Sequence, residues 1–389
     1  MSSGCFYHYQ PLLSTTFHDL CGDRLQPVVG RLKPAATLRL VKRALSLFLL
    51  LAAACATAPP PRARELRGVW VATVNNLDWP SRRDLTPEEQ QAELVAIFDR
   101  AKALGLNAIF LQVRPMADAF YPSAIEPWSE FLGSVPPYDP LAFAIAEAHA
   151  RGLELHAWFN PFRGHALAAN AYQYGKFVWM DPGDAEVQKQ SLDVVADVVR
   201  RYPVDGVHMD DYFYPYPEKD LEFPDAPTYE RYRGAGGRMS RDDWRRDNIN
   251  RFVRELYRSV KSIRPAVEVG ISPFGIWRPH NPQQIEGFDA YDKIYADSKL
   301  WLQRGWVDYL APQLYWAIDK KEQSFPVLMR WWMEHDRRRV GIVAGMSINR
   351  HPPEEIARQI AIVRREKGEG FILFSARKLY TLPVESLSP

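Results

Sequence analysis

The sequence has few cysteines, and all three of them, Cys5, Cys21 and Cys55, lie within its first 55 residues. A disulfide framework and a cysteine-ligated metal site are therefore excluded from the rest of the chain. The net charge is only +2. Because the first 55 residues carry six basic and two acidic side chains, the remainder is slightly acidic. We therefore expect no nucleic-acid partner, which would require basic residues massed on one face.

Two catalytic and binding motifs are also missing. No Gly-x-Ser-x-Gly sequence occurs, so acyl transfer by a serine triad is not favoured. No glycine-rich loop follows the first predicted strand, which argues against a doubly wound sheet that binds a dinucleotide. We expect no cofactor.

The N-terminal stretch has the pattern of a secretory leader. Residues 42–58 begin with two basic residues, continue with an apolar run and reach small residues around Cys55. The run is too short to span a membrane as a mature helix. It resembles the lipobox of bacterial lipoproteins, whose cysteine is acylated and becomes the new N-terminus. An ordinary signal peptide or an uncleaved anchor is the alternative.

This resemblance divides the chain into three parts. Residues 1–55 are the expected leader, with the true start near residue 41, and residues 56–64 form a proline-rich tether. The lipid on Cys55 then attaches the protein to a membrane of the cell envelope. Ala56 stands where inner-membrane lipoproteins usually have Asp, which favours the outer membrane, facing the periplasm.

From residue 65 to residue 389, short apolar runs alternate with amphipathic segments, as in repeated βα units. Helices are predicted over 87–104, 140–151, 184–201, 241–263, 289–304, 322–337 and 353–367. Eight strands are predicted over 66–73, 107–114, 153–160, 205–212, 268–274, 308–316, 340–347 and 370–376. The fold class is therefore α/β, with a single (β/α)8 TIM barrel.

Active sites of such barrels lie at the carboxyl ends of the strands, so the residues there carry the functional argument. The fourth predicted strand ends in Asp210 and Asp211. Side chains alternate along a strand, so Asp210 shares the face of His208 and one acid of the pair enters the barrel mouth. Two adjacent acids in such a place are costly unless they have a function. The alternative is that they cap a loop or bind Arg163.

Glycoside hydrolysis needs one carboxyl group to protonate the leaving oxygen and another to act as nucleophile or to activate water. Asp210 or Asp211 supplies one role. The predicted partner is Glu126, on the long loop after the second strand, with Glu130 and Asp118 as alternatives. Glu126 could equally be a solvated loop acid.

Aromatic and planar polar side chains at the strand ends suggest a sugar ligand. Sugar rings stack their C–H faces on Trp and Tyr, and sugar hydroxyls bind planar polar groups. Core packing is the alternative for each aromatic side chain. The expected substrate-binding residues are Arg114, Trp128, His156, Trp158, Asn160, Arg163, Tyr212, Trp277, Gln313, Tyr315 and Trp316.

A metal site is the competing interpretation of His156, His208, Asp210 and Asp211, because metal-dependent barrels gather His and Asp at strand ends. Their spacing is not specific, and no His-x-His pair ends the first strand. We therefore expect no metal.

Several segments resemble the glycosyl hydrolase-like 10 family, which includes divisome-localised glycosyl hydrolases of peptidoglycan. The similar segments are 67–74 (RGVWVATV), 77–80 (LDWP), 110–115 (FLQVRP), 125–130 (IEPWSE), 156–161 (HAWFNP), 181–183 (DPG), 202–214 (YPVDGVHMDDYFY), 270–278 (GISPFGIWR) and 311–316 (APQLYW). The resemblance implies a metal-independent (β/α)8 domain, often on a lipoprotein, that cleaves peptidoglycan glycan strands, including strands stripped of their stem peptides. The chain is expected to differ from many members of this family in two ways: the loop from Gly164 to Met180 is short, and C-terminal accessory domains are absent.

Together these features predict a lipid-anchored glycosidase whose substrate is peptidoglycan or a related envelope polysaccharide. A non-catalytic lipoprotein that binds sugars through the same aromatic cleft is the alternative. The paired acids favour the enzyme, since a binding protein would need the aromatic side chains but not the acids. Protein partners are not predictable from the sequence.

Overall fold

The computed structural model describes residues 64–165, 168 and 170–387. Cys55, the predicted leader and the tether as far as residue 63 lie outside the described residues. Within the described part of the chain, no helix has both the length and the apolar character needed to cross a membrane.

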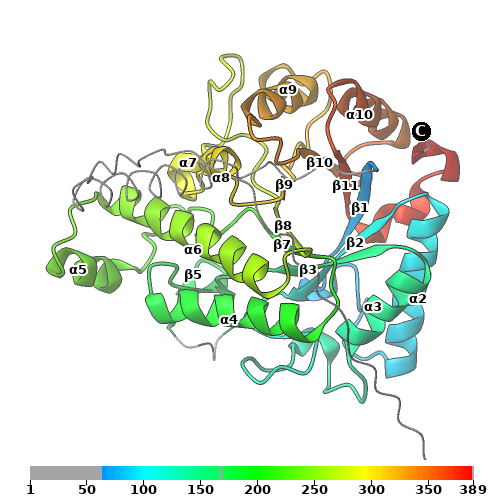
Figure 1. The fold of residues 1–389 in the computed structure, drawn as a ribbon, viewed down its shortest axis with the longest axis horizontal. Helices are drawn as coiled ribbons and strands as arrows, with labels where there is room; N and C mark the ends of the chain where they lie inside the picture. Colours follow the sequence, from blue (N-terminus) through cyan, green and yellow to red (C-terminus); the bar gives the residue numbers. More distant parts are fainter. Residues whose placement is uncertain (1–63, 166–167, 169, 388–389) are drawn as a thin grey trace, which may run out of the picture. The chain divides into compact units, whose positions relative to one another are not determined.

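Eight parallel strands form the central sheet (Figure 1). Their order is β10-β11-β1-β2-β3-β7-β8-β9. Parallel bridges from Leu310 to Ile342 and from Gln313 to Gly345 join β9 to the β10 segment and close the barrel. The predicted (β/α)8 fold is confirmed. The strands are β1 (Leu66–Val71), β2 (Ala108–Arg114), β3 (Glu154–Phe159), β7 (Gly206–Met209), β8 (Glu268–Ile271), β9 (Tyr309–Leu310), β10 (Val343–Ser347) and β11 (Gly370–Phe374).

Helices surround the strands (Figure 1), and several of them begin at caps that the sequence provides. Thr86 and Glu89 form a capping box at the start of α2, and Pro87 takes its first position, where the missing N–H costs nothing. The helices are α2 (Pro87–Ala103), α3 (Pro140–Ala150), α4 (Ala185–Arg201), α5 (Ala226–Gly234), α6 (Arg241–Ile263), α7 (Ala290–Lys293), α8 (Ser298–Arg304), α9 (Phe325–His335) and α10 (Pro353–Arg365).

The single helix predicted over 289–304 is wrong, because the segment forms two short helices. Between α7 and α8, Tyr295 adopts a positive φ of 57°. Its hydroxyl accepts a hydrogen bond of 2.6 Å from Nη1 of Arg245, and Asp297 then caps the amide of Leu300. A tertiary contact therefore accompanies the break in the helix. Helix α5 was not predicted.

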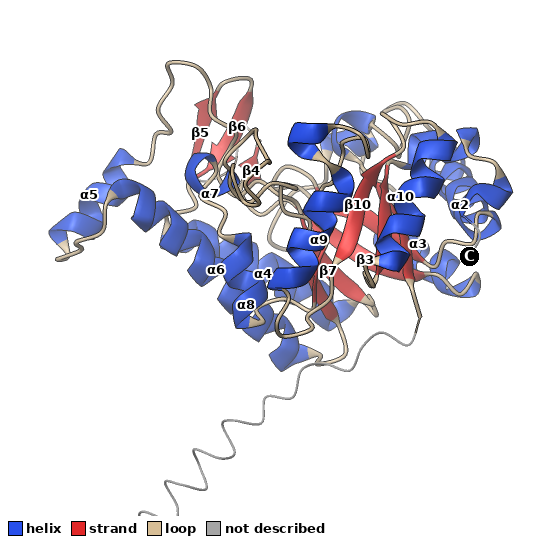
Figure 2. Cartoon of the chain, turned by 90° about the horizontal axis from the view of Figure 1, so that it is seen from above, coloured by secondary structure: helices blue, strands red, loops and turns tan. Residues whose placement is uncertain are grey.

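A second sheet lies between β3 and α4 in the sequence. It consists of β4 (Arg163–Gly164), β5 (Ala171–Tyr174) and β6 (Phe177–Met180), paired antiparallel in the order β4-β6-β5. Figure 2 shows it apart from the barrel strands. The described part of the segment expected to be a plain loop is thus a small sheet, in which Gly175 turns the β5–β6 hairpin with a positive φ of 58°.

A layer of large rings lies inside the barrel. Trp70 donates from Nε1 to Nε2 of His208 at 3.0 Å, and the Tyr309 hydroxyl lies 3.0 Å from Nδ1 of His208 and 3.2 Å from Nδ1 of His156. Gly206 makes room for this layer, because a Cβ there would lie 2.1 Å from Nδ1 of His156. These rings form the floor below the carboxyl ends of the strands.

Candidate active site

A cavity of about 290 Å³ opens above this floor, at the carboxyl ends of the strands. This size is near the lower end of the range for small-molecule sites, about 300–1,000 Å³. The lining side chains come from the ends of several strands and from the loops that follow them: Trp70, Ala72, Val74, Leu77, Gln112, Trp158, Asp210, Asp211, Tyr212, Tyr216, Ser272, Gln313, Tyr315 and Phe374.

Asp210 and Asp211 follow the last residue of β7 and both line the cavity. The amide of Asp211 donates to Oδ1 of Asp210 at 3.0 Å. Nε2 of Gln313 lies 3.3 Å from Oδ1 of each aspartate, so one amide group connects the two carboxyls. The Tyr216 hydroxyl donates to Oδ2 of Asp211.

The two carboxyl groups differ in their affinity for a proton. Burial, followed by the adjacent charge of Asp210, raises the pKa of Asp211 well above its ordinary value. Burial also raises the pKa of Asp210, but hydrogen bonds from Asp211 and Tyr212 and the positive charge of Arg163 oppose that rise. The two carboxyls titrate as a pair, and the pair retains a proton to a higher pH than an ordinary aspartate does.

Aromatic rings form much of the cavity wall. Tyr315 stacks on Phe374 with ring centroids 6.0 Å apart. Trp158 donates from Nε1 to Oδ1 of Asn160 at 3.1 Å, and Nδ2 of Asn160 donates to the Tyr212 hydroxyl at 3.0 Å. Asn160 is fully buried and fixes two wall residues, although it does not itself line the cavity.

The comparison with family models matches glycosyl hydrolase-like 10 over residues 65–175 and 168–361. The chain belongs to this family. Among its curated relatives, glycosyl hydrolase YngK of Bacillus subtilis is 41% identical over 357 residues, covering 82% of this chain and 70% of that protein. Glycosyl hydrolase DigH of Escherichia coli is 38% identical over 311 residues, covering 70% of each chain.

Solved structures of low identity support the fold of this family member. The PgaB (BpsB) glycoside hydrolase domain of Bordetella bronchiseptica superposes with a TM-score of 0.59 and 15% identity, covering 83% of this chain and 98% of that one. An endo-β-1,4-mannanase of Thermotoga petrophila gives a TM-score of 0.52 at 11% identity, over 81% of this chain and 68% of that one. At these identities the likeness concerns the barrel alone.

Glu126 does not lie with the aspartate pair. It accepts hydrogen bonds from the guanidinium of Arg114, one of them 2.8 Å from Nε to Oε2, and both side chains are 1% exposed. Nε2 of Gln190, on α4, donates to Oε1 of Glu126 at 3.0 Å, and Arg114 also donates to the carbonyl of Asn160 at 2.6 Å. The buried ion pair therefore supports the wall behind Asn160.

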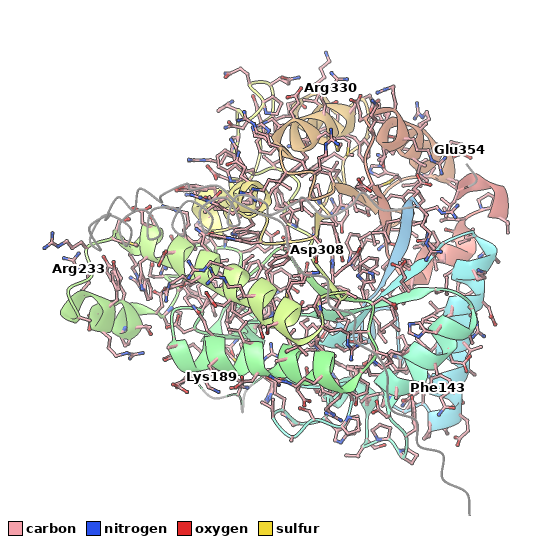
Figure 3. All side chains as sticks on the ribbon, in the orientation of Figure 1. Phe143, Lys189, Arg233, Asp308, Arg330 and Glu354 are labelled. Atoms are coloured by element: carbon pink, nitrogen blue, oxygen red, sulfur yellow. The ribbon has the colours of Figure 1, made fainter. Side chains whose placement is uncertain are left out.

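A second hollow of about 550 Å³ lies over this ion pair, and Glu126 lines it together with His165, Lys189 and Asp193. Lys189, labelled in Figure 3, is an exposed residue on the outside of α4. Of the three predicted catalytic acids, Asp210 and Asp211 therefore lie together at the barrel mouth, and Glu126 does not.

Of the other predicted binding residues, Trp158, Tyr212, Gln313 and Tyr315 line the cavity, and the rest do not. His156 belongs to the buried floor. Arg163 packs on the ring of Phe177 at 4.1 Å and lies 3.4 Å from the Tyr212 hydroxyl.

Three predicted tryptophans pack among neighbouring elements. Trp128 is half-buried in the loop after β2 and pairs through its backbone with Ala119. Trp277 stacks on Trp331 of α9 at 5.9 Å. Trp316 packs edge-on against Phe274 with ring centroids 5.7 Å apart.

Trp70, Gln112, Tyr216 and Phe374 line the cavity but were not among the predicted site residues. Gln112 alternates onto the same face of β2 as Phe110, a pattern that could have revealed it. Its Oε1 accepts from the amides of Thr73 and Val74 at 2.9 Å, whereas its buried Nε2 has no partner among the described residues. Gln112 therefore offers a donor at the cavity wall.

Within the described ranges, no group of three or more His, Cys, Asp or Glu side chains is arranged to hold a metal ion. His208 uses one ring nitrogen toward Trp70 and the other toward Tyr309. A metal ligand would need one of these two nitrogens, and both already face other residues of the floor.

Proposed function

We propose that this protein is a glycosidase that cleaves the glycan strands of peptidoglycan or a related envelope polysaccharide, with strands stripped of their stem peptides as a substrate form. The observation that carries the proposal is a pair of carboxyl groups with different proton affinities in an aromatic cavity at the barrel mouth. Membership of the glycosyl hydrolase-like 10 family supports it.

In the proposed reaction Asp211 is the general acid and Asp210 the ionised carboxylate. The protonated Asp211 gives its proton to the leaving glycosidic oxygen, and the negative charge of Asp210 stabilises the positive charge that develops on the sugar. Gln313 holds both groups in place. Trp158 and Tyr315 supply flat apolar faces for sugar rings.

The first experiment measures release of soluble sugars from purified peptidoglycan, intact and amidase-stripped, by the wild type, Asp210→Asn and Asp211→Asn. Loss of a general acid costs about 10² to 10⁴ in rate. Glu130→Gln is the control, because Glu130 is an exposed acid that pairs with Arg83 at 2.7 Å.

The glycosidase proposal is supported if the wild type and Glu130→Gln release soluble sugars and the two aspartate variants do not. If the wild type co-sediments with peptidoglycan but releases no sugars from either form, the protein is instead a sugar-binding lipoprotein without glycosidase activity. Melting temperatures of all variants exclude loss of folding as the cause.

The proposal includes attachment to the cell envelope by a lipid on Cys55, at the outer membrane facing the periplasm. It is supported by the basic, apolar and small-residue pattern of residues 42–55. Labelled palmitate should be incorporated into the wild type but not into Cys55→Ser, and fractionation should place the labelled protein in the outer membrane. Absence of label from the wild type would refute the lipid anchor.

A further inference from the structure

The two cavity carboxyls approach the substrate from one strand end. Asp210 and Asp211 are consecutive residues, the amide of Asp211 donates to Oδ1 of Asp210, and the same Gln313 amide contacts both carboxyls. Most glycosidases instead place an acid and a nucleophile, or an acid and a base, on the two sides of the bond that is cleaved. Because one Gln313 amide nitrogen reaches both carboxyls, the two groups lie side by side and do not flank a sugar ring.

Among the described residues, no third carboxylate lines the cavity. Asp78 lies beyond the end of β1, and its oxygens accept from the amides of Ala72 and Arg377 at 2.8 and 3.0 Å and from the Ser375 hydroxyl at 2.7 Å. Asp118 and Glu126 are likewise buried and engaged, by the Met116 amide and by Arg114. None of these three acids is free to attack a sugar carbon.

We infer that the nucleophile is the acetamido group of the substrate, so that the enzyme takes β-linked 2-acetamido-2-deoxy sugars and reacts by substrate assistance. This inference rests on the proposed glycosidase function. Substrate-assisted glycosidases need only an acid/base and a group that holds the acetamido nitrogen, which two adjacent carboxyls can provide. A β-linkage is required because the equatorial acetamido group must attack C1 from the face opposite the leaving oxygen.

The atoms balance in two steps. The acetamido carbonyl oxygen bonds to C1 while the C1–oxygen glycosidic bond breaks, and the Asp211 proton moves to the leaving oxygen. Asp210 accepts the hydrogen bond of the acetamido N–H and stabilises the cyclic oxazolinium. Water then bonds to C1, the ring oxygen of the oxazolinium leaves as the restored acetamido carbonyl, and the water proton returns to Asp211. The product retains the β configuration.

The cavity wall suits such a sugar. Asp210, to which no arginine among the described residues donates a hydrogen bond, can accept an amide N–H. Trp158 and Tyr315 offer apolar surface to the acetyl methyl group. The Nε2 of Gln112, unpartnered within the described part of the chain, can donate to a ring hydroxyl. A buried donor left unpaired is costly, and a hydrogen bond to a bound hydroxyl would offset that cost.

The test uses one batch of peptide-free glycan strands in three forms: N-acetylated, de-N-acetylated and then N-trifluoroacetylated, and de-N-acetylated and then re-acetylated. The trifluoroacetyl group keeps the shape and neutrality of the acetyl group but makes the carbonyl oxygen a poor nucleophile. We expect the trifluoroacetylated strands to be cleaved at least about 100-fold more slowly, because an oriented internal nucleophile contributes a large part of the rate. Re-acetylation should restore cleavage.

Proton NMR of the first product gives the second measurement, and we expect the β anomer before mutarotation. Equal rates on acetylated and trifluoroacetylated strands, or an α anomer formed first, would overturn substrate assistance while leaving the glycosidase intact. No cleavage of any form would overturn both. A sugar thiazoline, which imitates the oxazoline, should bind the wild type more tightly than Asp210→Asn by calorimetry. Melting curves confirm that this variant is folded, and equal affinity would argue against the role of Asp210.

Discussion

Replacing Glu126 by glutamine tests whether this residue is the second catalytic carboxyl or a support. In the fold, Arg114 and Glu126 are each 1% exposed and form a paired hydrogen-bonded contact. If the introduced glutamine turns its carbonyl oxygen toward Nη2 of Arg114, its amide group faces the Nε–H that in the wild type donates to Oε2 at 2.8 Å. The arginine charge then remains buried and incompletely paired.

Breaking one partner of a buried ion pair costs about 3–5 kcal/mol. From the average unfolding entropy per residue, a domain of this size should lose about 4–7 °C in melting temperature. Glu130→Gln is the matched control on the same loop. Because the Glu130 side chain is 59% exposed and its partner Arg83 is 52% exposed, we expect a change below about 1 kcal/mol.

The assay combines thermal unfolding with kcat on peptidoglycan strands, measured well below the melting temperature. We expect Glu126→Gln to melt early yet to keep most of its kcat, because Glu126 does not line the cavity of the aspartate pair. An unchanged melting temperature with kcat reduced by about 10² to 10⁴, as expected for loss of a general acid, would refute the supporting role and restore Glu126 as the acid.

Three further predictions follow from buried groups. Burial raises the pKa of Asp211 well above its ordinary value, so the protein is stabilised while Asp211 is neutral and loses that stability as pH rises through the folded-state pKa. Asp211→Asn, which cannot ionise, should therefore melt at a higher temperature than the wild type at pH 8 but not at pH 3. Burial raises the pKa of Asp181 to about 6, so the wild type also loses stability as Asp181 ionises. Measured by denaturant unfolding, the free energy of unfolding of Asp181→Asn should rise by up to about 3 kcal/mol relative to the wild type between pH 3 and pH 8. A difference that does not change with pH would contradict either of these two predictions. Gly206→Ala should lower the free energy of unfolding by at least about 1–3 kcal/mol in the same assay, because its Cβ would lie 2.1 Å from Nδ1 of His156. Gly234→Ala is the control and should not lose stability, because the space around Gly234 is open. Equal stability of the two variants would contradict the packing of the floor.

Local patterns predicted the barrel well. Apolar runs of strand length alternate with helices whose caps are encoded in the sequence, such as Thr86 with Glu89 and Asp139 before Pro140. The period-two alternation of β7 predicts that Asp210, and not Asp211, shares the face of His208 toward the barrel interior. Asp210 lines the cavity there, but Asp211 lines it as well, because β7 ends at Met209 and the alternation does not continue beyond it.

Tertiary contacts explain what the sequence did not reveal. Arg114 and Glu126 are 12 residues apart across a loop, and only the fold shows that they satisfy each other. Trp277 looked like a sugar platform at a strand end, but it stacks on Trp331, which comes from a distant helix. Tyr216 lies beyond the strand on an irregular loop, where no periodicity indicates the direction of a side chain.

The closure of the barrel has a consequence for its motions. Strand β9 is only two residues long, and isolated bridges join its segment to β10. One of these bridges involves Gln313, whose side chain holds both aspartates. Segments with few backbone pairs open locally at lower free energy than the rest of a fold. In amide hydrogen exchange this seam should therefore exchange before the other strand pairs of the barrel, and each opening would withdraw the Gln313 amide from the two carboxyls while the rest of the barrel stays folded.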